Sequence, residues 1–265
     1  MAGDGRLTGW AVVLGASSGF GEACTLELAA RGMDILGIHL DRAATQPNAD
    51  RIQAEVKRLG RKALFINMNA ADEAKRKEAL DQAAPQIGEG GVKLLLHSLA
   101  FGTLKPYIGD KPADALAKSQ MEMTLDVMAH SLVYWVQDLF HRKLLGKGAR
   151  IYAMTSEGGA RIWKTYGAVS AAKAALESHI RQLAVELAPH GITANAIRAG
   201  VTDTPALRKI PGNEQMIEAS KRRNPGGRLT EPKDVARAIG CLATSDTQWI
   251  TGNIIGVDGG EFVTS

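Results

Sequence analysis

The sequence has little cysteine and no long apolar run, and both absences limit what the protein can be. Its 265 residues include two cysteines, Cys24 and Cys241, in helix-like patterns without the spacing of a zinc site or a disulfide framework. No run approaches the roughly 18 apolar residues of a membrane span, and Met1 to Thr8 lacks the apolar core of a signal peptide. We therefore expect a cytoplasmic protein with no membrane partner.

Neither sign of charge predominates in the sequence. The formal net charge is +4, charged residues make up 23% of the chain and apolar residues 45%, as in ordinary soluble globular proteins. This balance is far from that of a nucleic-acid-binding protein, so we expect no nucleic-acid partner. We also expect no metal, because the histidines in helical segments lack ligand spacing: His130, His141, His179 and His190.

What the sequence does contain is a regular alternation of apolar strands and amphipathic helices. This alternation predicts an α/β protein: a single-domain doubly wound parallel sheet (Rossmann fold) over residues 1–265, with helices on both faces. The expected strands are Trp10–Leu14, Asp34–Ile38, Ala63–Ile66, Val92–Leu96, Ile151–Thr155, Ile192–Ile197 and Asn253–Asp258. The expected helices are Glu22–Arg31, Ala49–Leu59, Glu73–Ile87, one or two within Pro112–Leu145, and Tyr166 to about Pro189.

A glycine-rich turn lies between the first strand and the first helix. Backbone amides and the positive end of a helix bind a dinucleotide pyrophosphate at such a turn. The spacing is G-x3-G-x-G rather than the more familiar G-x-G-x-x-G, and a glycine-rich loop without a ligand is the alternative. The residues expected to line the pyrophosphate are Gly15, Ser17, Ser18, Gly19, Phe20 and Gly21.

Three groups able to take part in proton chemistry follow the fifth expected strand: Ser156, Tyr166 and Lys173. Tyr166 and Lys173 are seven residues apart, which on a helix places them on nearly the same face, roughly 10 Å apart along the axis. A nearby ammonium favours the phenolate and so lowers the pKa of a tyrosine. The alternative is an amphipathic helix that carries both residues by chance.

Taken together, these motifs resemble the short-chain dehydrogenase/reductase superfamily over essentially the whole chain. The glycine turn, Asn195-Ala-Ile-Arg-Ala-Gly200 and Gly252-Asn-Ile-Ile-Gly-Val-Asp-Gly-Gly260 carry the resemblance. Common members have a tyrosine four residues before the lysine, where Val169 stands here. The Y-x6-K spacing, His97-Ser-Leu-Ala-Phe101 and Ala199-Gly200 are instead similar to a divergent branch of the enoyl-acyl-carrier-protein reductases.

Two differences from the better-known enoyl reductases leave an ordinary short-chain dehydrogenase as an alternative. Better-known enoyl reductases carry a second tyrosine ten residues before the catalytic one, where Ser156 stands. Counted back from Lys173, Ser156 also occupies the serine position of ordinary short-chain dehydrogenases. Their helix asparagine corresponds to Met128 here, so the resemblance does not extend to an asparagine-linked proton relay.

The resemblance implies NAD(P)H-dependent reduction of the trans-2 C=C bond of an enoyl thioester in fatty-acid synthesis. Hydride then goes to Cβ, and the tyrosine must lie farther along the site than in ketone reduction. Moving it back by one helical turn of about 5 Å supplies this displacement. The implied roles are stabilisation of the enolate by Tyr166, ribose binding and pKa lowering by Lys173, and support of the thioester oxygen or of Tyr166 by Ser156, while capping of the loop is the alternative for Ser156. Phe101 and Tyr166 are expected to contact the substrate.

The remaining cofactor contacts are likewise implied by the resemblance. The choice between NADPH and NADH depends on the end of the second strand, where Arg42 suits a 2′-phosphate and Asp41 opposes one if it points inward. We expect NADPH rather than NADH. The residues expected around the adenosine and nicotinamide ends are His39, Arg42, Asn69, Ala70, Ser98, Leu99, Ala100, Lys173, Val201 and Thr204.

A segment at about 204–227, interrupted by prolines, corresponds to the substrate-covering loop of the family. Its basic residues Lys221, Arg222 and Arg223, with Lys209 and Arg228, are expected to attract an acidic carrier protein, or else to form a solvated helix face. A tetramer built on the two long helices is expected from the family. Two other functions stay open: a carbonyl or alcohol dehydrogenase of the same superfamily, and a non-catalytic NAD(P)-binding sensor.

Overall fold

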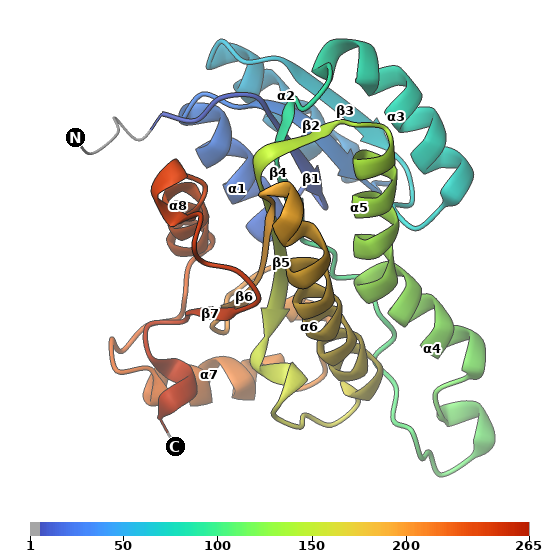
Figure 1. Ribbon diagram of the computed structural model, residues 1–265. Coiled ribbons are helices and arrows are strands. Elements are labelled where there is room, and N and C mark those ends of the chain that lie inside the picture. Colours follow the sequence, from blue (N-terminus) through green and yellow to red (C-terminus); the bar gives the residue numbers. More distant parts are fainter. Residues whose placement is uncertain (1–5, 265) are drawn as a thin grey trace.

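In residues 6–264, which the computed structural model describes, seven parallel strands form one sheet in the order β3-β2-β1-β4-β5-β6-β7 (Figure 1). Most of the Met1–Thr8 segment considered above lies outside these residues. The order reverses between β1 and β4, which is where doubly wound sheets bind ligands. The predicted fold class is therefore confirmed. The strands are β1 (Trp10–Leu14), β2 (Asp34–His39), β3 (Ala63–Asn67), β4 (Val92–His97), β5 (Leu145–Ser156), β6 (Thr193–Ala199) and β7 (Ile254–Val257).

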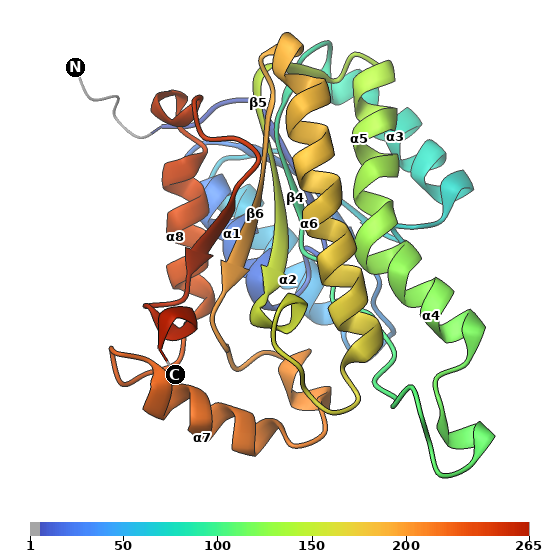
Figure 2. The ribbon, with the colours of Figure 1, turned by 60° about the horizontal axis from the view of Figure 1, so that its bottom comes forward.

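Helices cover both faces of the sheet (Figures 1 and 2). One buried apolar cluster joins the sheet to α3, α5 and α6, and a second joins the other face to α1 and α8. Within the described residues, no helix has both the length and the apolar character needed to cross a bilayer. The helices are α1 (Gly19–Ala30), α2 (Gln46–Arg58), α3 (Glu73–Ile87), α4 (Lys118–Leu125), α5 (Ser131–His141), α6 (Gly167–Leu187), α7 (Asn213–Arg223) and α8 (Pro232–Leu242).

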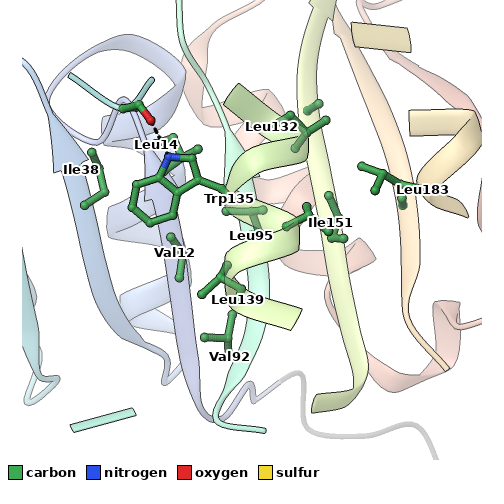
Figure 3. Close-up of a cluster of buried hydrophobic side chains, with 14 of the residues drawn as sticks. Val12, Leu14, Ile38, Val92, Leu95, Leu132, Trp135, Leu139, Ile151 and Leu183 are labelled. Carbon is green, nitrogen blue, oxygen red and sulfur yellow. Dashed lines mark hydrogen bonds between the residues drawn. The ribbon is translucent and has the colours of Figure 1, made fainter. Parts of the chain in front are cut away.

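Trp135 of α5 anchors the first of these clusters (Figure 3). Its indole packs among Val12, Leu14 and Leu95 of the two central strands and is fully buried. The indole Nε1 donates to the Ala70 carbonyl oxygen at 2.8 Å, so the polar atom of this large side chain is satisfied. This contact fixes the loop after β3 against the sheet.

The segment expected to be helical over Pro112–Leu145 is shorter than predicted. Pro112–Asp114 forms a single 3-10 turn, and the chain is helical from Lys118 to His141 with a π-helical turn at Asp126–His130 between α4 and α5. Lys143, with a φ of 57°, leaves the helical conformation. Leu145 therefore begins β5, six residues before the predicted start.

The helix α8 was not among those expected. Pro232 occupies its first turn, and the Asp234 carboxylate accepts from the Glu231 amide at 2.9 Å, a start signal of Pro and an acidic residue. The other boundaries agree with the prediction to within three residues. The interrupted segment 204–227 holds a 3-10 turn, Leu207–Lys209, and α7.

Candidate active site

The glycine turn is closed by direct contact between backbones. Gly15 has a φ of 90°, and a Cβ there would lie 2.4 Å from the Ser98 carbonyl oxygen at the end of β4. A Cβ at Gly21 would lie 1.9 Å from the Gly15 oxygen, so α1 can pack against the turn only without a side chain. A Cβ at Gly19 would meet the Thr204 methyl at 3.6 Å. The loops after β1, β4 and β6 therefore meet in a cradle kept free of side chains, which suits the pyrophosphate expected there.

The first turn of α1 presents its amides to this cradle. Ser18 precedes the helix in an extended conformation, and its hydroxyl makes no capping hydrogen bond. The Ser17 carbonyl accepts from Asn48 Nδ2 at 2.6 Å, which fixes the turn to α2. Phe20 lies within the helix and packs against the second apolar cluster. The amides at the start of α1 are thus held toward the cradle by contacts behind them.

At the end of β2, the Asp41 carboxylate points inward. Its Oδ2 lies 2.8 Å from Nδ1 of the buried His39. Burial alone raises the pKa of Asp41, but hydrogen bonds from Thr45, Ser17 and His39 lower it below its ordinary value. Asp41 is therefore a carboxylate beside the glycine turn. Arg42 is exposed, and its guanidinium has no hydrogen-bond or ion-pair partner in residues 6–264.

Some of the residues expected near the adenine and nicotinamide are exposed to solvent, and others are buried. Asn69 is exposed, and its Oδ1 accepts from the Ala71 amide at 3.0 Å. Ala70 is buried and its carbonyl is used by Trp135. A Cβ at Gly15 would lie 3.4 Å from a Leu99 methyl, which places Leu99 against the turn. Ala100 and Phe101 are exposed, and Phe101 presents 54% of its surface.

Ser156 and Tyr166 come together beside Gly158. A Cβ at Gly158 would lie 2.4 Å from a Tyr166 ring carbon and 3.2 Å from the Ser156 hydroxyl. That hydroxyl accepts from the Gly158 amide at 3.2 Å, so Ser156 caps the loop as well as facing Tyr166. Burial raises the pKa of Tyr166, and the hydrogen bond with Ser156 acts in the opposite direction. Gly158, which was not among the predicted site residues, makes room for the tyrosine ring.

Lys173 is buried beside the same loop, since a Cβ at Gly159 would lie 3.6 Å from the Lys173 Cβ. Its Nζ donates to the Met154 carbonyl oxygen at 2.7 Å. Burial lowers the pKa of Lys173 to about 8, while the Glu177 carboxylate one helical turn further raises it. The expected lowering of the Tyr166 pKa by Lys173 is not found, because burial dominates and Ser156 is the neighbour that opposes it. Glu177, overlooked in the sequence, accepts from the Thr155 hydroxyl at 2.6 Å and was detectable as an i,i+4 partner of the lysine.

His97 lies beneath the same region in an uncharged form. Its Nε2 is 2.9 Å from the Ser131 hydroxyl, which itself donates to the Val127 carbonyl oxygen at 2.8 Å. Nε2 therefore carries the proton. Burial, and then the charge of Lys173, lower the pKa of His97 to about 3. The histidine is thus a fixed neutral support between β4 and α5.

The position where ordinary dehydrogenases carry their tyrosine is closed. Val169 is 4% exposed and belongs to the apolar core. A Cβ at Gly102 would lie 2.7 Å from a Val169 methyl, 2.8 Å from Thr124 and 2.9 Å from the Met128 sulfur. A phenol at this helix position would have to displace the side chains packed around Val169. Tyr166, one turn earlier, is the tyrosine that does.

In the loop after β6, Val201 is bonded to the end of the chain. The Val201 amide donates to Glu261 Oε2 at 3.1 Å, and Glu261 is fully buried. The cofactor contact expected of Val201 stays a prediction. Thr204 caps the next turn, since its hydroxyl accepts from the Leu207 amide at 3.2 Å.

Comparison with known proteins agrees with this geometry. A family model described as Enoyl-(Acyl carrier protein) reductase matches residues 15–261. An Arabidopsis thaliana NADPH-dependent aldehyde reductase-like protein, chloroplastic, is 30% identical, with 94% of this chain and 93% of the relative covered. A 1-cyclohexenylcarbonyl-CoA reductase of Streptomyces collinus is 28% identical over 94% of this chain and 85% of the relative. A short-chain dehydrogenase from Burkholderia cenocepacia, solved with NADP, superposes with a TM-score of 0.82 at 28% identity, covering 97% and 99% of the two chains.

The parallel sheet with a glycine cradle at its switch point and the oxidoreductases that match nearly the whole chain together identify an NAD(P)-dependent oxidoreductase. Within that class, the chain belongs to the short-chain dehydrogenase/reductase superfamily, in the family described by the enoyl-(acyl carrier protein) reductase model.

Proposed function

We propose that the protein reduces the trans-2 C=C bond of an enoyl thioester with a nicotinamide cofactor. The observation that carries the proposal is the pair Tyr166 and Lys173 together with the closed position at Val169. The donor is thereby displaced by one helical turn, toward the thioester oxygen and away from the carbon that receives hydride. A relative named for reducing 1-cyclohexenylcarbonyl-CoA, whose substrate is itself an enoyl thioester, supports the same chemistry.

Separate groups of residues would bind the cofactor and stabilise the enolate. When bound, the cofactor supplies the hydride that goes to Cβ; Gly15, Gly19 and the start of α1 would hold its pyrophosphate. Tyr166, neutral because burial raises its pKa, donates a hydrogen bond to the oxygen where enolate charge develops. Ser156 orients the Tyr166 hydroxyl. Lys173 is held by the Met154 carbonyl and Glu177 beneath them.

A second function, reduction of a carbonyl, is favoured by one specific contact. Ser156 faces Tyr166, as the serine and tyrosine of an ordinary dehydrogenase do. The similarity to an aldehyde reductase-like protein points the same way. Carbonyl reduction requires hydride to reach the carbon bonded directly to the oxygen that Tyr166 contacts.

The two functions are separated by offering crotonyl-CoA and acetoacetyl-CoA with NADPH and with NADH. We expect NAD(P)H oxidation with crotonyl-CoA. Turnover of acetoacetyl-CoA alone would establish the carbonyl reductase instead. Binding of NAD(P)H without turnover of either would identify a sensor.

Docking of a carrier protein has less support than the sequence alone indicated. Arg223 points inward, Lys221 lies 3.1 Å from Glu218, and Arg228 lies 2.6 Å from Asp234. Arg222 and Lys209 are exposed and have no ion-pair partner in residues 6–264. We therefore propose CoA or carrier-bound substrate without a preference. A tetramer also stays a prediction.

A further inference from the structure

The last residue of α7 is turned away from solvent. Of three consecutive basic residues, Arg223 alone points inward, with 19% of its side chain exposed. Its Nη2 donates to both carboxylate oxygens of Glu157, at 2.8 and 2.9 Å, and to Glu261 Oε1 at 2.8 Å. These two side chains are 12% and 0% exposed. One guanidinium thus joins a fully buried carboxylate to a largely buried one.

Each carboxylate belongs to a different wall of the site. Glu157 lies between Ser156 and Gly158, the residues against Tyr166. Glu261 uses its other oxygen to accept from the Val201 amide. Arg223 therefore joins three parts of the chain: the covering segment (residues 204–227), the loop that carries Ser156 and Tyr166, and the loop after β6.

The junction depends on the positive charge at its centre. Burial raises the pKa of Glu157, Arg223 and Arg161 lower it, and Glu261 and Asp258 raise it again. Arg161 is farther away, with its Nε 3.4 Å from Glu157. Removing one partner of a buried ion pair leaves an uncompensated charge, which is more costly than losing an exposed pair. Without Arg223 the two carboxylates would repel each other, and the covering segment would lose its charged attachment. It would keep only neutral hydrogen bonds, such as those from Asn224 to the Asp258 carbonyl oxygen and from Trp163 to the Pro211 carbonyl oxygen.

We propose that Arg223 is a positioning residue that holds the covering segment against the loop of Ser156 and Tyr166 and so shapes the acyl side of the active site. The proposal rests on the proposed function only for the identity of the substrate. The attachment itself is independent of any reaction.

Hydrogen exchange of the full-length chain tests the attachment without substrate. In Arg223→Gln, backbone amides of residues 207–223 should exchange at least about tenfold faster than in the wild type. Arg222→Gln, which removes an exposed charge from the same helix, should leave this exchange unchanged. Equal exchange in both variants would overturn the proposal.

Kinetics then test the consequence for the substrate. With crotonyl-CoA, Arg223→Gln should raise KM by about tenfold and leave the Kd for the cofactor within about twofold, and Arg223→Lys should recover part of the loss. A proportional change in substrate KM and cofactor Kd would indicate general damage and contradict the positioning role. Absence of turnover in the wild type would refute the proposed function, while the exchange result would still decide the attachment.

If Arg223→Gln fails to fold, Glu157→Gln opens the same junction from the other side. The expected result is again faster exchange confined to residues 207–223. Wild-type exchange in both Glu157→Gln and Glu261→Gln would refute the attachment, because either variant alone leaves Arg223 paired with the other carboxylate.

Discussion

The glycine turn and the surroundings of Tyr166, at the two ends of the candidate site, are held in place by different kinds of contact. At the glycine turn, the fit depends on backbone atoms that approach where no side chain is present, as between Gly15 and Ser98. Around Tyr166, it depends on side chains held by other side chains, as with Lys173, Glu177 and Thr155. An atom added at the glycine turn should therefore disturb the fit, whereas around Tyr166 the loss of a functional group should reduce activity or change stability.

The largest expected effect is at the end built from side chains. Tyr166→Phe removes one hydroxyl and keeps the ring against Gly158. Loss of a preorganised donor typically costs about 10²–10³ in kcat, and cofactor binding should be unchanged. Steady-state kinetics with crotonyl-CoA and fluorescence titration with NADPH measure the two. Near-native turnover would remove Tyr166 from the mechanism.

The buried ammonium of Lys173 should make stability depend on pH. Its pKa is about 8 in the folded protein against 10.5 ordinarily. Between these values the unfolded chain binds more protons, so the free energy of unfolding should rise with pH. The rise amounts to about 3 kcal/mol and is complete near pH 10.5, whereas below pH 8 the full cost of burying the charge is present.

Lys173→Met provides the reference for that measurement. Buried tyrosines titrate in both proteins, so their effect cancels in the difference between the two denaturation series. The wild type should gain stability relative to Lys173→Met from pH 8 to 10.5. A constant difference would show that burial does not lower the pKa of Lys173 in the folded protein.

At the end built from backbone, Gly15→Ala should weaken cofactor binding. The added methyl would lie 2.4 Å from the Ser98 oxygen, at a φ of 90° that alanine disfavours. Overpacking of this kind costs about 1–3 kcal/mol, or roughly 5- to 150-fold in Kd if it falls on the bound state. Gly60→Ala is a control with a similar φ of 76° and open space around it. Equal Kd values for the two variants would contradict the role of the close contact.

The smallest effect concerns the choice of cofactor. If Arg42 binds a 2′-phosphate, Arg42→Ala should lower kcat/KM for NADPH by roughly five- to tenfold, since an exposed charge-assisted contact is partly screened, and leave NADH unaffected. Asp41→Ala should act in the opposite direction, because its carboxylate lies beside the turn. Equal effects on both cofactors would remove these residues from the selection.

Much of this arrangement could be predicted because it depends on short spacings. The buried strands and the glycine turn are local patterns, and each places its last residues at one edge of the sheet. The direction of Arg223 could not be predicted, because its partners Glu157 and Glu261 lie 66 and 38 residues away. Three adjacent basic residues look alike in sequence, and only the phase of α7 against its neighbours distinguishes them. Likewise, the end of α5 depends on the left-handed conformation of Lys143, which no residue type requires.

The π-helical turn at Asp126–His130 has a consequence for the active-site loop. Such a turn accommodates one residue more than an α-helical turn, so α4 is rotated about its axis relative to a continuous helix with α5. The present phase directs Thr124 to the loop after β4, where its hydroxyl accepts from the Thr103 amide at 3.0 Å. Deleting a single residue from this turn would rotate α4 by about 100° and carry Thr124 away from the loop. The length of one helical turn therefore sets which face of α4 meets the substrate-side loop.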